Sequence, residues 1–290
     1  MGFEQDKQKV KDYYNQEVNT WKDIYKEESE EYPANTIRLN FIVERLKQNK
    51  VKSVFDVGCG ACGPIIRLLN EGFTVKGFDF SEEMIKEGKK ELEKAGFDPN
   101  LVNKGDLEDK STFPNEKFDA IIALGVLPHV ENVDRALNNI KNILNDNGVV
   151  FISFRNDLFA AYTMNKYSLD FFINRVINLG ELPDDVSDDI VSYYSDRLKT
   201  DKPVKRKNGK IDFTDIYAKF HNPLNIDTEL FEPNGFNVAN IHFYHYHALP
   251  PIFEDKYPEL FRKESLKIEK PNDWRGYLLA SAFVVEAKKQ

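Results

Sequence analysis

A glycine-rich turn between an apolar strand and a helix constrains this chain more than any other segment. The sequence VKSVFDVGCGACGPIIRLL (residues 51–69) passes from β-branched residues through Gly58, Gly60 and Gly63 into an apolar helical pattern. Glycines at this spacing let the backbone come very close to another group at the start of a helix. Alone the spacing is a weak signal, because many such turns are purely structural.

Strand and helix patterns alternate on both sides of this turn. Residues 51–155 contain five short apolar runs typical of buried strands, with helical patterns between most of them. This alternation predicts a parallel sheet covered by helices on both faces. Two further β-rich runs, 235–249 and 276–287, predict an antiparallel pair at the sheet edge. We therefore expect an α/β fold with a doubly wound, mostly parallel sheet of seven strands.

Acidic residues end the second and third predicted strands. Asp79 lies 19 residues after Gly60, where a carboxylate can accept both hydroxyl groups of a ribose. Asp106 ends the third strand, where a carboxylate can accept a hydrogen bond from the amino group of adenine. Met84 and Leu107 are placed to flank the base. Together with the glycine turn, these residues predict a nucleoside ligand.

Asp56 decides which nucleoside ligand fits best. It precedes Gly58 by two residues, at the end of the first strand. A carboxylate there suits a ligand that carries an ammonium group and a sulfonium, and it disfavours a pyrophosphate. An NAD-type oxidoreductase is therefore the weaker alternative. A nucleoside-cofactor-binding protein without catalysis stays open, because the sequence has no motif for a second substrate.

The order of these segments resembles the class I S-adenosylmethionine-dependent methyltransferases. The resemblance covers about residues 50–155 and rests on VFDVGCG (54–60), VKGFDFSEEMI (75–85), GDLED (105–109), FDAIIALGVLPHV (118–130) and LNDNGVVFIS (144–153). It implies a Rossmann-like fold, S-adenosyl-L-methionine as cofactor and methyl transfer as the activity. One position departs from the family pattern, because Cys62 stands where a glycine is usual and Gly63 follows one place later.

The resemblance also implies roles for individual residues. Asp56 and the glycine turn contact the methionine part of the cofactor, Asp79 the ribose and Asp106 the adenine, while the backbone near Leu124 lines the methionine pocket. The predicted cofactor site consists of Asp56, Gly58, Gly60, Asp79, Phe80, Met84, Asp106, Leu107, Leu124 and Gly125.

His129 is the candidate catalytic residue. It follows the fourth strand in LPHVEN, next to the expected position of the methyl group, where an imidazole can take a proton from the acceptor. Ordering of the loop is the alternative interpretation, and His221 and His245 are further candidates for the base.

No metal site is predicted. His245 and His247 share one face of their predicted strand and His242 takes the other, which leaves a tetrahedral site incomplete unless His221 or a carboxylate from the insertion completes it. Cys59 and Cys62 form a C-x-x-C pair inside the glycine turn, for which we expect a packing role.

Charge and hydropathy limit the partners. The net charge of −8 argues against nucleic acid as a partner. The sequence predicts no signal peptide and no membrane span, because no apolar run approaches about 18 residues. We expect a cytoplasmic enzyme that acts at oxygen or nitrogen of a small-molecule acceptor. Residues 155–172 loosely resemble methyltransferases of sugar and surface-polysaccharide pathways, which suggests a sugar or sugar-derived acceptor. The sequence leaves the oligomeric state open.

Four segments follow from this interpretation. Residues 1–50 form an N-terminal helical lid and residues 51–155 the cofactor-binding core. Residues 156–235 interrupt the alternation and predict a helical insertion between the fifth and sixth strands that caps the acceptor side. Residues 236–290 supply the C-terminal strand pair that completes the sheet.

Overall fold

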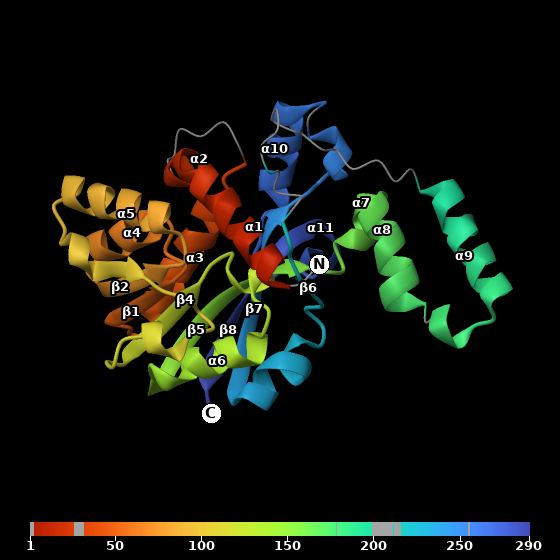
Figure 1. Cartoon of the computed structure of the whole chain (residues 1–290). Coiled ribbons are helices and arrows are strands. Elements are labelled where there is room, and N and C mark those ends of the chain that lie inside the picture. The colour runs from red at the N-terminus through yellow and green to blue at the C-terminus, as the bar shows by residue number, and fades with distance from the viewer. Residues whose placement is uncertain (1–2, 26–31, 178, 199–210, 212–215, 255) are drawn as a thin grey trace.

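A central sheet with helices on both faces organises the molecule (Figure 1). The computed structural model describes residues 3–25, 32–177, 179–198, 211, 216–254 and 256–290. Within these residues the sheet has eight strands in the order β3-β2-β1-β4-β5-β8-β7, and β6 pairs with β5 off this path. The strands are β1 (Ser53–Val57), β2 (Thr74–Asp79), β3 (Val102–Lys104), β4 (Phe118–Ala123), β5 (Leu144–Asn156), β6 (Phe220–His221), β7 (Phe236–Tyr246) and β8 (Ala280–Lys289).

The direction of the strands confirms the predicted fold class. Strands β1 to β6 run parallel where they pair, and β8 is antiparallel to both β5 and β7. The strand count differs from the prediction by one, because β6 contains only Phe220 and His221. Two residues are too short to produce a periodic pattern in a sequence.

Two apolar layers hold the helices against the sheet. One layer packs α3 (Ala34–Gln48), α4 (Gly63–Asn70) and α5 (Glu82–Lys94) on one face. The other layer packs α6 (Val133–Asn142) and the turn η7 (Asp227–Phe231) on the opposite face. The central strands are therefore buried on both sides, which explains their nearly continuous apolar sequences.

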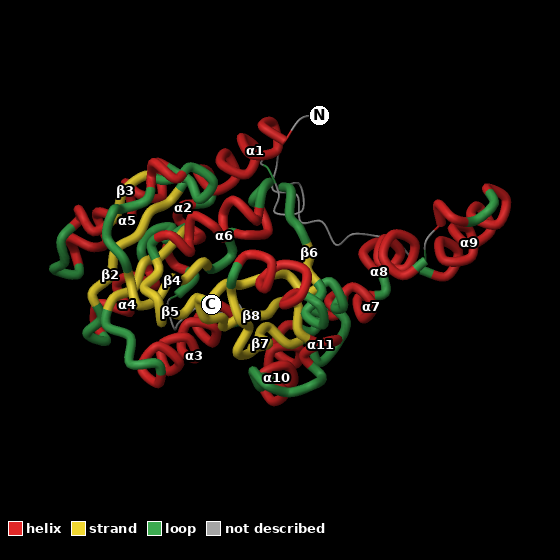
Figure 2. Tube along the Cα trace, turned by 90° about the horizontal axis from the view of Figure 1, so that it is seen from below, coloured by secondary structure: helices red, strands yellow, loops and turns green. Residues whose placement is uncertain are grey.

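The remaining helices lie at the ends and edge of the sheet. Helices α1 (Phe3–Gln16) and α2 (Val18–Asp23) precede α3, and α10 (Pro258–Ile268) and α11 (Gly276–Leu279) contact β7. Figures 1 and 2 show α8 (Lys166–Phe171) and α9 (Asp184–Arg197) extending away from the sheet, beyond α7 (Ala160–Thr163). No residue of α9 is buried. The described part of residues 156–235 thus contains helices, and its role as a cap stays a prediction.

A buried carboxylate ties α3 to the antiparallel edge. Glu286 on β8 is 1% exposed and accepts hydrogen bonds from Arg45 Nε (2.8 Å), Arg45 Nη2 (2.8 Å), Asn49 Nδ2 (3.1 Å) and His242 Nε2 (3.0 Å). Burial alone would raise the pKa of Glu286, but the bonds from His242, Arg45 and Asn49 outweigh burial and lower the pKa to about 2. His242 is thereby committed to a structural contact.

We expect Glu286 to make stability depend on acid. Its folded pKa lies below the unfolded value near 4.5, so its contribution is present above pH 4.5 and is lost as pH falls towards 2. Glu286→Gln should reduce the free energy of unfolding at pH 6 by about 1–3 kcal/mol. At pH 3 the free energies of unfolding of the variant and of the unsubstituted protein should differ by less than at pH 6. Urea unfolding at both pH values measures this, with exposed Glu83→Gln as control. A constant difference across pH would contradict the assignment.

Candidate active site

One cavity collects the ten residues predicted for the cofactor and the candidate catalytic residue His129. It has a volume of about 200 Å³ and lies beyond the carboxyl ends of β1, β2 and β4. The predicted residues that line it are Asp56, Gly58, Gly60, Asp79, Phe80, Met84, Asp106, Leu107, Leu124, Gly125 and His129. The N-terminal helices add Lys7, Val10, Lys11, Tyr14, Trp21, Tyr25, Asn35 and Arg38. The site is therefore built from the strand ends below and from the N-terminal helices above.

The glycine turn faces this cavity in a backbone conformation that residues with a side chain rarely adopt. Gly58 and Gly60 have φ angles of +76° and +53°. The backbone N–H groups of Gly58 and Cys59 both donate to the carbonyl of Phe78, at 2.8 and 3.0 Å, which fixes the turn to β2. An added Cβ at Gly60 would meet no protein atom within 4 Å, whereas one at Gly58 would overlap Val126. The backbone at Gly60 is thus open to a ligand.

Cys62 occupies the position where a glycine was expected from the family pattern. It is the N-cap of α4 and has a φ of +67°, in the left-handed region that favours glycine. The turn keeps its path although Cys62 carries a side chain. Its buried thiol lies against Gly88, because a Cβ at Gly88 would overlap the Cys62 sulfur. This contact agrees with the packing role predicted for the cysteines, both of which are buried and free.

Asp79 is held in place by the two loops beside it. Its Oδ2 accepts the N–H of Gly60 at 2.8 Å, and its Oδ1 accepts the N–H of Ser81 at 2.8 Å. Ser81 also caps α5, because its hydroxyl accepts the N–H of Met84, as its position before the helix predicts. Burial raises the pKa of Asp79, and the backbone donors oppose this. The carboxylate is fixed at the cavity wall with lone pairs left for a ligand.

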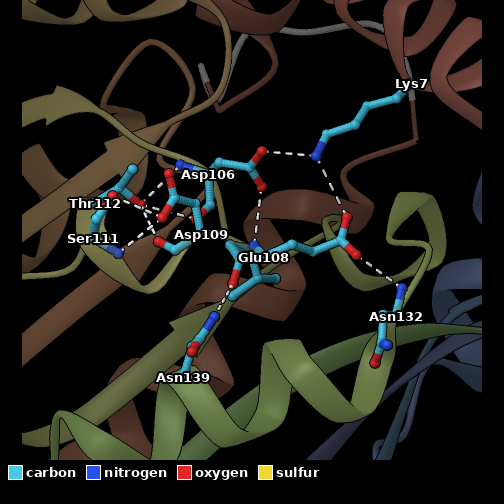
Figure 3. Close-up of polar contacts among 9 residues, drawn as sticks. Lys7, Asp106, Glu108, Asp109, Ser111, Thr112, Asn132 and Asn139 are labelled. Atoms are coloured by element: carbon cyan, nitrogen blue, oxygen red, sulfur yellow. Dashed lines mark hydrogen bonds and ion pairs between the residues drawn. The ribbon is translucent and has the colours of Figure 1, made fainter.

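Asp106 lies at the opposite end of the cavity from the methionine-side residues. Figure 3 shows its carboxylate between Lys7 and the backbone of Glu108. Oδ2 pairs with Lys7 Nζ at 2.7 Å, and Oδ1 accepts the Glu108 N–H at 2.9 Å. Thr112 closes the loop by bonding the N–H and carbonyl of Asp106.

Asp56 and Arg38 line the cavity, and each has a buried polar atom without a hydrogen-bond partner. Among the described residues, Asp56 Oδ2 and Arg38 Nε are buried without a hydrogen-bond partner. The other nitrogens of Arg38 donate to Tyr244, Tyr25 and Asn35. Burial and the nearby charge of Asp79 raise the pKa of Asp56 to about 8, although Arg38 opposes this shift. A carboxyl group and a guanidinium group, each with one atom that lacks a hydrogen-bond partner, suit a ligand that carries both an ammonium and a carboxylate group.

Sequence reasoning missed Arg38, although a signal existed. Arg38 falls on the stripe of α3 that otherwise carries Ala34, Ile42 and Leu46, and it is 5% exposed. A charged residue on the buried stripe of a helix points to an internal partner or a ligand.

His129 contacts the N-terminal helix. It lies in the turn η3 (Leu127–His129); Nδ1 is 2.6 Å from the carbonyl of Tyr217, and Nε2 is 3.2 Å from the hydroxyl of Tyr14. A carbonyl can only accept, so Nδ1 carries the proton and Nε2 accepts from Tyr14. Burial, assisted by Arg155, lowers the pKa of His129 to about 4. The imidazole is neutral at pH 7, and its base role stays a prediction.

The other histidines named above lie outside the cavity lining. His245 Nδ1 is 2.8 Å from the Ser281 hydroxyl, and the His247 ring contacts Phe159 and Phe261. In the described part of the chain, histidine, cysteine and acidic residues form no group of three that could hold a metal ion.

One protein family matches the part of the chain that contains all ten predicted cofactor residues. Residues 55–152 match the family described as "Methyltransferase domain". These residues therefore form a methyltransferase domain. The family predicted from the sequence and its cofactor are thereby confirmed for this domain.

A curated relative and two solved structures illustrate how far the likeness extends. The chain is 29% identical over 146 residues to a ubiquinone biosynthesis O-methyltransferase of Rickettsia canadensis (strain McKiel), a match that covers 49% of this chain and 61% of that protein. Magnesium protoporphyrin IX methyltransferase (ChlM) from Synechocystis PCC 6803 with bound SAH superposes with a TM-score of 0.57 at 18% identity, over 98% of this chain and 100% of the other. The [4+2]-cyclase SpnF gives a TM-score of 0.55 at 14% identity, over 98% and 96%. At these identities the two structures show the shared fold alone.

The matches leave part of each relative uncovered. The chain spans between 56% and 61% of the length of three curated relatives. None of the helices that the structure describes is both long and apolar enough to cross a bilayer.

We expect cofactor binding to the methyltransferase domain to release a proton through Asp56. Its pKa near 8 means that it is protonated at pH 7 in the free protein, and a bound ammonium group favours its ionised form. The affinity for S-adenosylhomocysteine should rise between pH 6 and 8, by up to about tenfold per pH unit. Calorimetry in buffers of different ionisation enthalpy measures the released proton. Asp56→Asn should remove the pH dependence, and a wild-type protein that releases no proton would refute the assignment.

Proposed function

We propose that the chain transfers the methyl group of S-adenosylmethionine to an oxygen or nitrogen atom of a small-molecule acceptor. The observation that carries the proposal is the pair of buried, unpartnered atoms, Asp56 Oδ2 and Arg38 Nε, on two residues that line the same cavity as Asp79 and Asp106. Asp56 and Arg38 suit an amino-acid zwitterion, Asp79 suits a ribose, and Asp106 suits an adenine.

Each group of the cofactor has a matching residue in this proposal. Asp56 receives the ammonium group and Arg38 the carboxylate of the methionine part. Asp79 accepts from the ribose hydroxyls, and Asp106 accepts from the adenine amino group. Met84 and Leu107, both buried, pack beside the base. Gly60 gives the methionine part room, because nothing of the protein lies within 4 Å of its missing side chain.

The protein contributes orientation and exclusion of water to methyl transfer. The bound cofactor supplies an electrophilic methyl group on a sulfonium. Tyr14 and Trp21 from the N-terminal helices and Val126 from the loop after β4 line the cavity with apolar surface. Such a wall holds acceptor and methyl in line and keeps competing water away.

Two rival functions are separable by experiment. A dinucleotide cofactor would place its pyrophosphate at the glycine turn beside Asp56, a carboxylate that disfavours phosphate groups. The fold likeness to a [4+2]-cyclase makes a different reaction in the same fold the second rival. Calorimetry with S-adenosylmethionine and with NAD⁺ tests the first rival, and formation of S-adenosylhomocysteine tests the second.

The acceptor side carries a cation as well. Arg155 at the end of β5 pairs across the sheet with Phe220 on β6 and Ala282 on β8, and its guanidinium lies 5.7 Å from the centre of the Phe220 ring. Its charge reaches Tyr14 and His129, which line the cavity. The name of the Rickettsia relative supports an oxygen acceptor, and the loose likeness of residues 155–172 supports a sugar-derived one.

A screen of candidate acceptors, together with an Asp79→Ala variant, tests the function. The protein is incubated with S-adenosylmethionine and with catechols, hydroxybenzoates, nucleotide sugars and primary amines, and S-adenosylhomocysteine is measured. We expect turnover with at least one class, and a loss of about 10- to 100-fold in cofactor affinity for Asp79→Ala. Cofactor binding without turnover on any class would favour the cyclase-like or binding rival. An Asp79→Ala variant that binds normally would remove Asp79 from the site.

His129 gives the proposal a second test, once an acceptor is known. With His129 as base, the acidic limb of the kcat profile should lie near pH 4 rather than near 6.5, because burial lowers its pKa. His129→Gln should lower kcat by about 10²- to 10⁴-fold and remove that limb. Tyr14→Phe keeps the imidazole and should lower kcat much less. A His129→Gln protein with normal kcat and lower thermal stability would assign the residue to the loop.

A further inference from the structure

Lys7 connects the first helix to the carboxylate assigned to adenine. Its Nζ lies 2.7 Å from Asp106 Oδ2 and 3.5 Å from Glu108 Oε2, across about a hundred residues of sequence (Figure 3). Lys7 and Asp106 both line the cavity. We propose that Lys7 is a positioning residue for the cofactor, which fastens α1 over the adenine end and slows release of the bound nucleoside. The inference rests on the proposed function.

The carboxylate can serve Lys7 and a ligand together. Asp106 Oδ1 accepts one backbone N–H and Oδ2 accepts Lys7, so each oxygen retains acceptor capacity for the amino group of a base. The ion pair holds the carboxylate in one orientation before the ligand arrives. Such preorganisation lowers the entropic cost of binding.

Lys7 also lies over an aromatic ring of the same site. The Nζ atoms of Lys7 and Lys11 are 5.4 and 5.5 Å from the centre of the Phe80 ring. Phe80 directly follows Asp79, the residue assigned to the ribose. Two successive turns of α1 therefore carry cations towards the nucleoside half of the cavity.

Other contacts of α1 reach the same rim. Asn15 Oδ1 accepts the Ser81 hydroxyl at 2.6 Å, and the Tyr14 hydroxyl lies 3.2 Å from His129. These residues border the ribose and the acceptor ends. Because α1 contacts the rim at the adenine, ribose and acceptor ends, a ligand enclosed below it leaves only after such contacts break. Lys7 supplies the charged one.

The second helix provides a matched control. Lys22 on α2 pairs with Glu87 at 2.6 Å and with Glu91 at 3.1 Å, both on α5. It holds the N-terminal helices to the same domain but is absent from the cavity lining. A general loosening of these helices would make Lys22→Gln and Lys7→Gln equivalent. A specific role at the adenine end predicts that they differ.

Binding kinetics of S-adenosylhomocysteine to the full chain test the proposal. Trp21, which lines the cavity, reports binding by fluorescence in a Trp274→Phe background. We expect Lys7→Gln to raise the dissociation rate about tenfold or more while the association rate changes less than about threefold. Lys7→Arg should restore slow release, and Lys22→Gln should raise the rate less than about threefold.

Ionic strength supplies a readout that a purely structural role would not move. Raising salt from 0.05 to 0.5 M should speed dissociation from the wild type and leave dissociation from Lys7→Gln nearly unchanged, because salt screens the partly exposed ion pair. Glu108→Gln, which keeps Asp106, should show a smaller effect of the same sign and serves if Lys7→Gln does not fold.

Two outcomes would overturn the proposal and differ in what they leave standing. If the wild type binds S-adenosylhomocysteine and Lys7→Gln releases it at the same rate, or Lys22→Gln releases it equally fast, the role of Lys7 is wrong and the proposed function stands. If the wild type does not bind S-adenosylhomocysteine, the proposed function fails and the role of Lys7 fails with it.

Discussion

The closeness of a buried carboxylate, Asp56, to a partly buried one, Asp79, governs the electrostatics of the cavity. Asp56 and Asp79 end adjacent parallel strands, where register places Asp56 beside Gly77, two residues before Asp79. Each raises the other's cost of ionisation in a setting of low polarity, and Asp79 accordingly helps to raise the pKa of Asp56. Backbone N–H groups compensate Asp79, while Asp56 keeps an unpaired oxygen. Asp56 therefore keeps acceptor capacity, which the proposed function assigns to the ammonium group of the cofactor.

The part of the fold that the sequence predicted well is the part with strong local rules. Parallel strands buried on both faces must be apolar, and a glycine turn that approaches a ligand must contain glycines at fixed spacing. The predicted residues of the cofactor site meet in one cavity for this reason, since they lie at the strand ends of one sheet or in the loops and helix starts that follow them. The short strand β6 and the bonds of His129 to Tyr14 and Tyr217 depend on distant partners, which a local pattern does not contain.

The cations of the site were harder to predict than its acids. Asp56, Asp79 and Asp106 sit at positions that the strand pattern marks, whereas Lys7 and Arg38 come from helices whose place over the sheet is a matter of tertiary packing. Arg38 interrupts an apolar stripe and could have been noticed. Lys7 lies on a helix rich in lysine, where one charged residue looks like its neighbours. Helix amphipathicity indicates which face is buried but not which ligand that face meets.

Cys62 limits which substitutions the glycine turn and helix α5 can accept. Its side chain fills the space that Gly88 leaves on α5, while its own backbone adopts a conformation suited to glycine. The two positions therefore constrain each other by size. Exchange of Cys62 for glycine would relax the backbone and leave a void, and a methyl group at position 88 would then have room that it lacks at present. A side chain at position 88 is therefore compatible only with a smaller residue at position 62, so the order in which the two positions change matters.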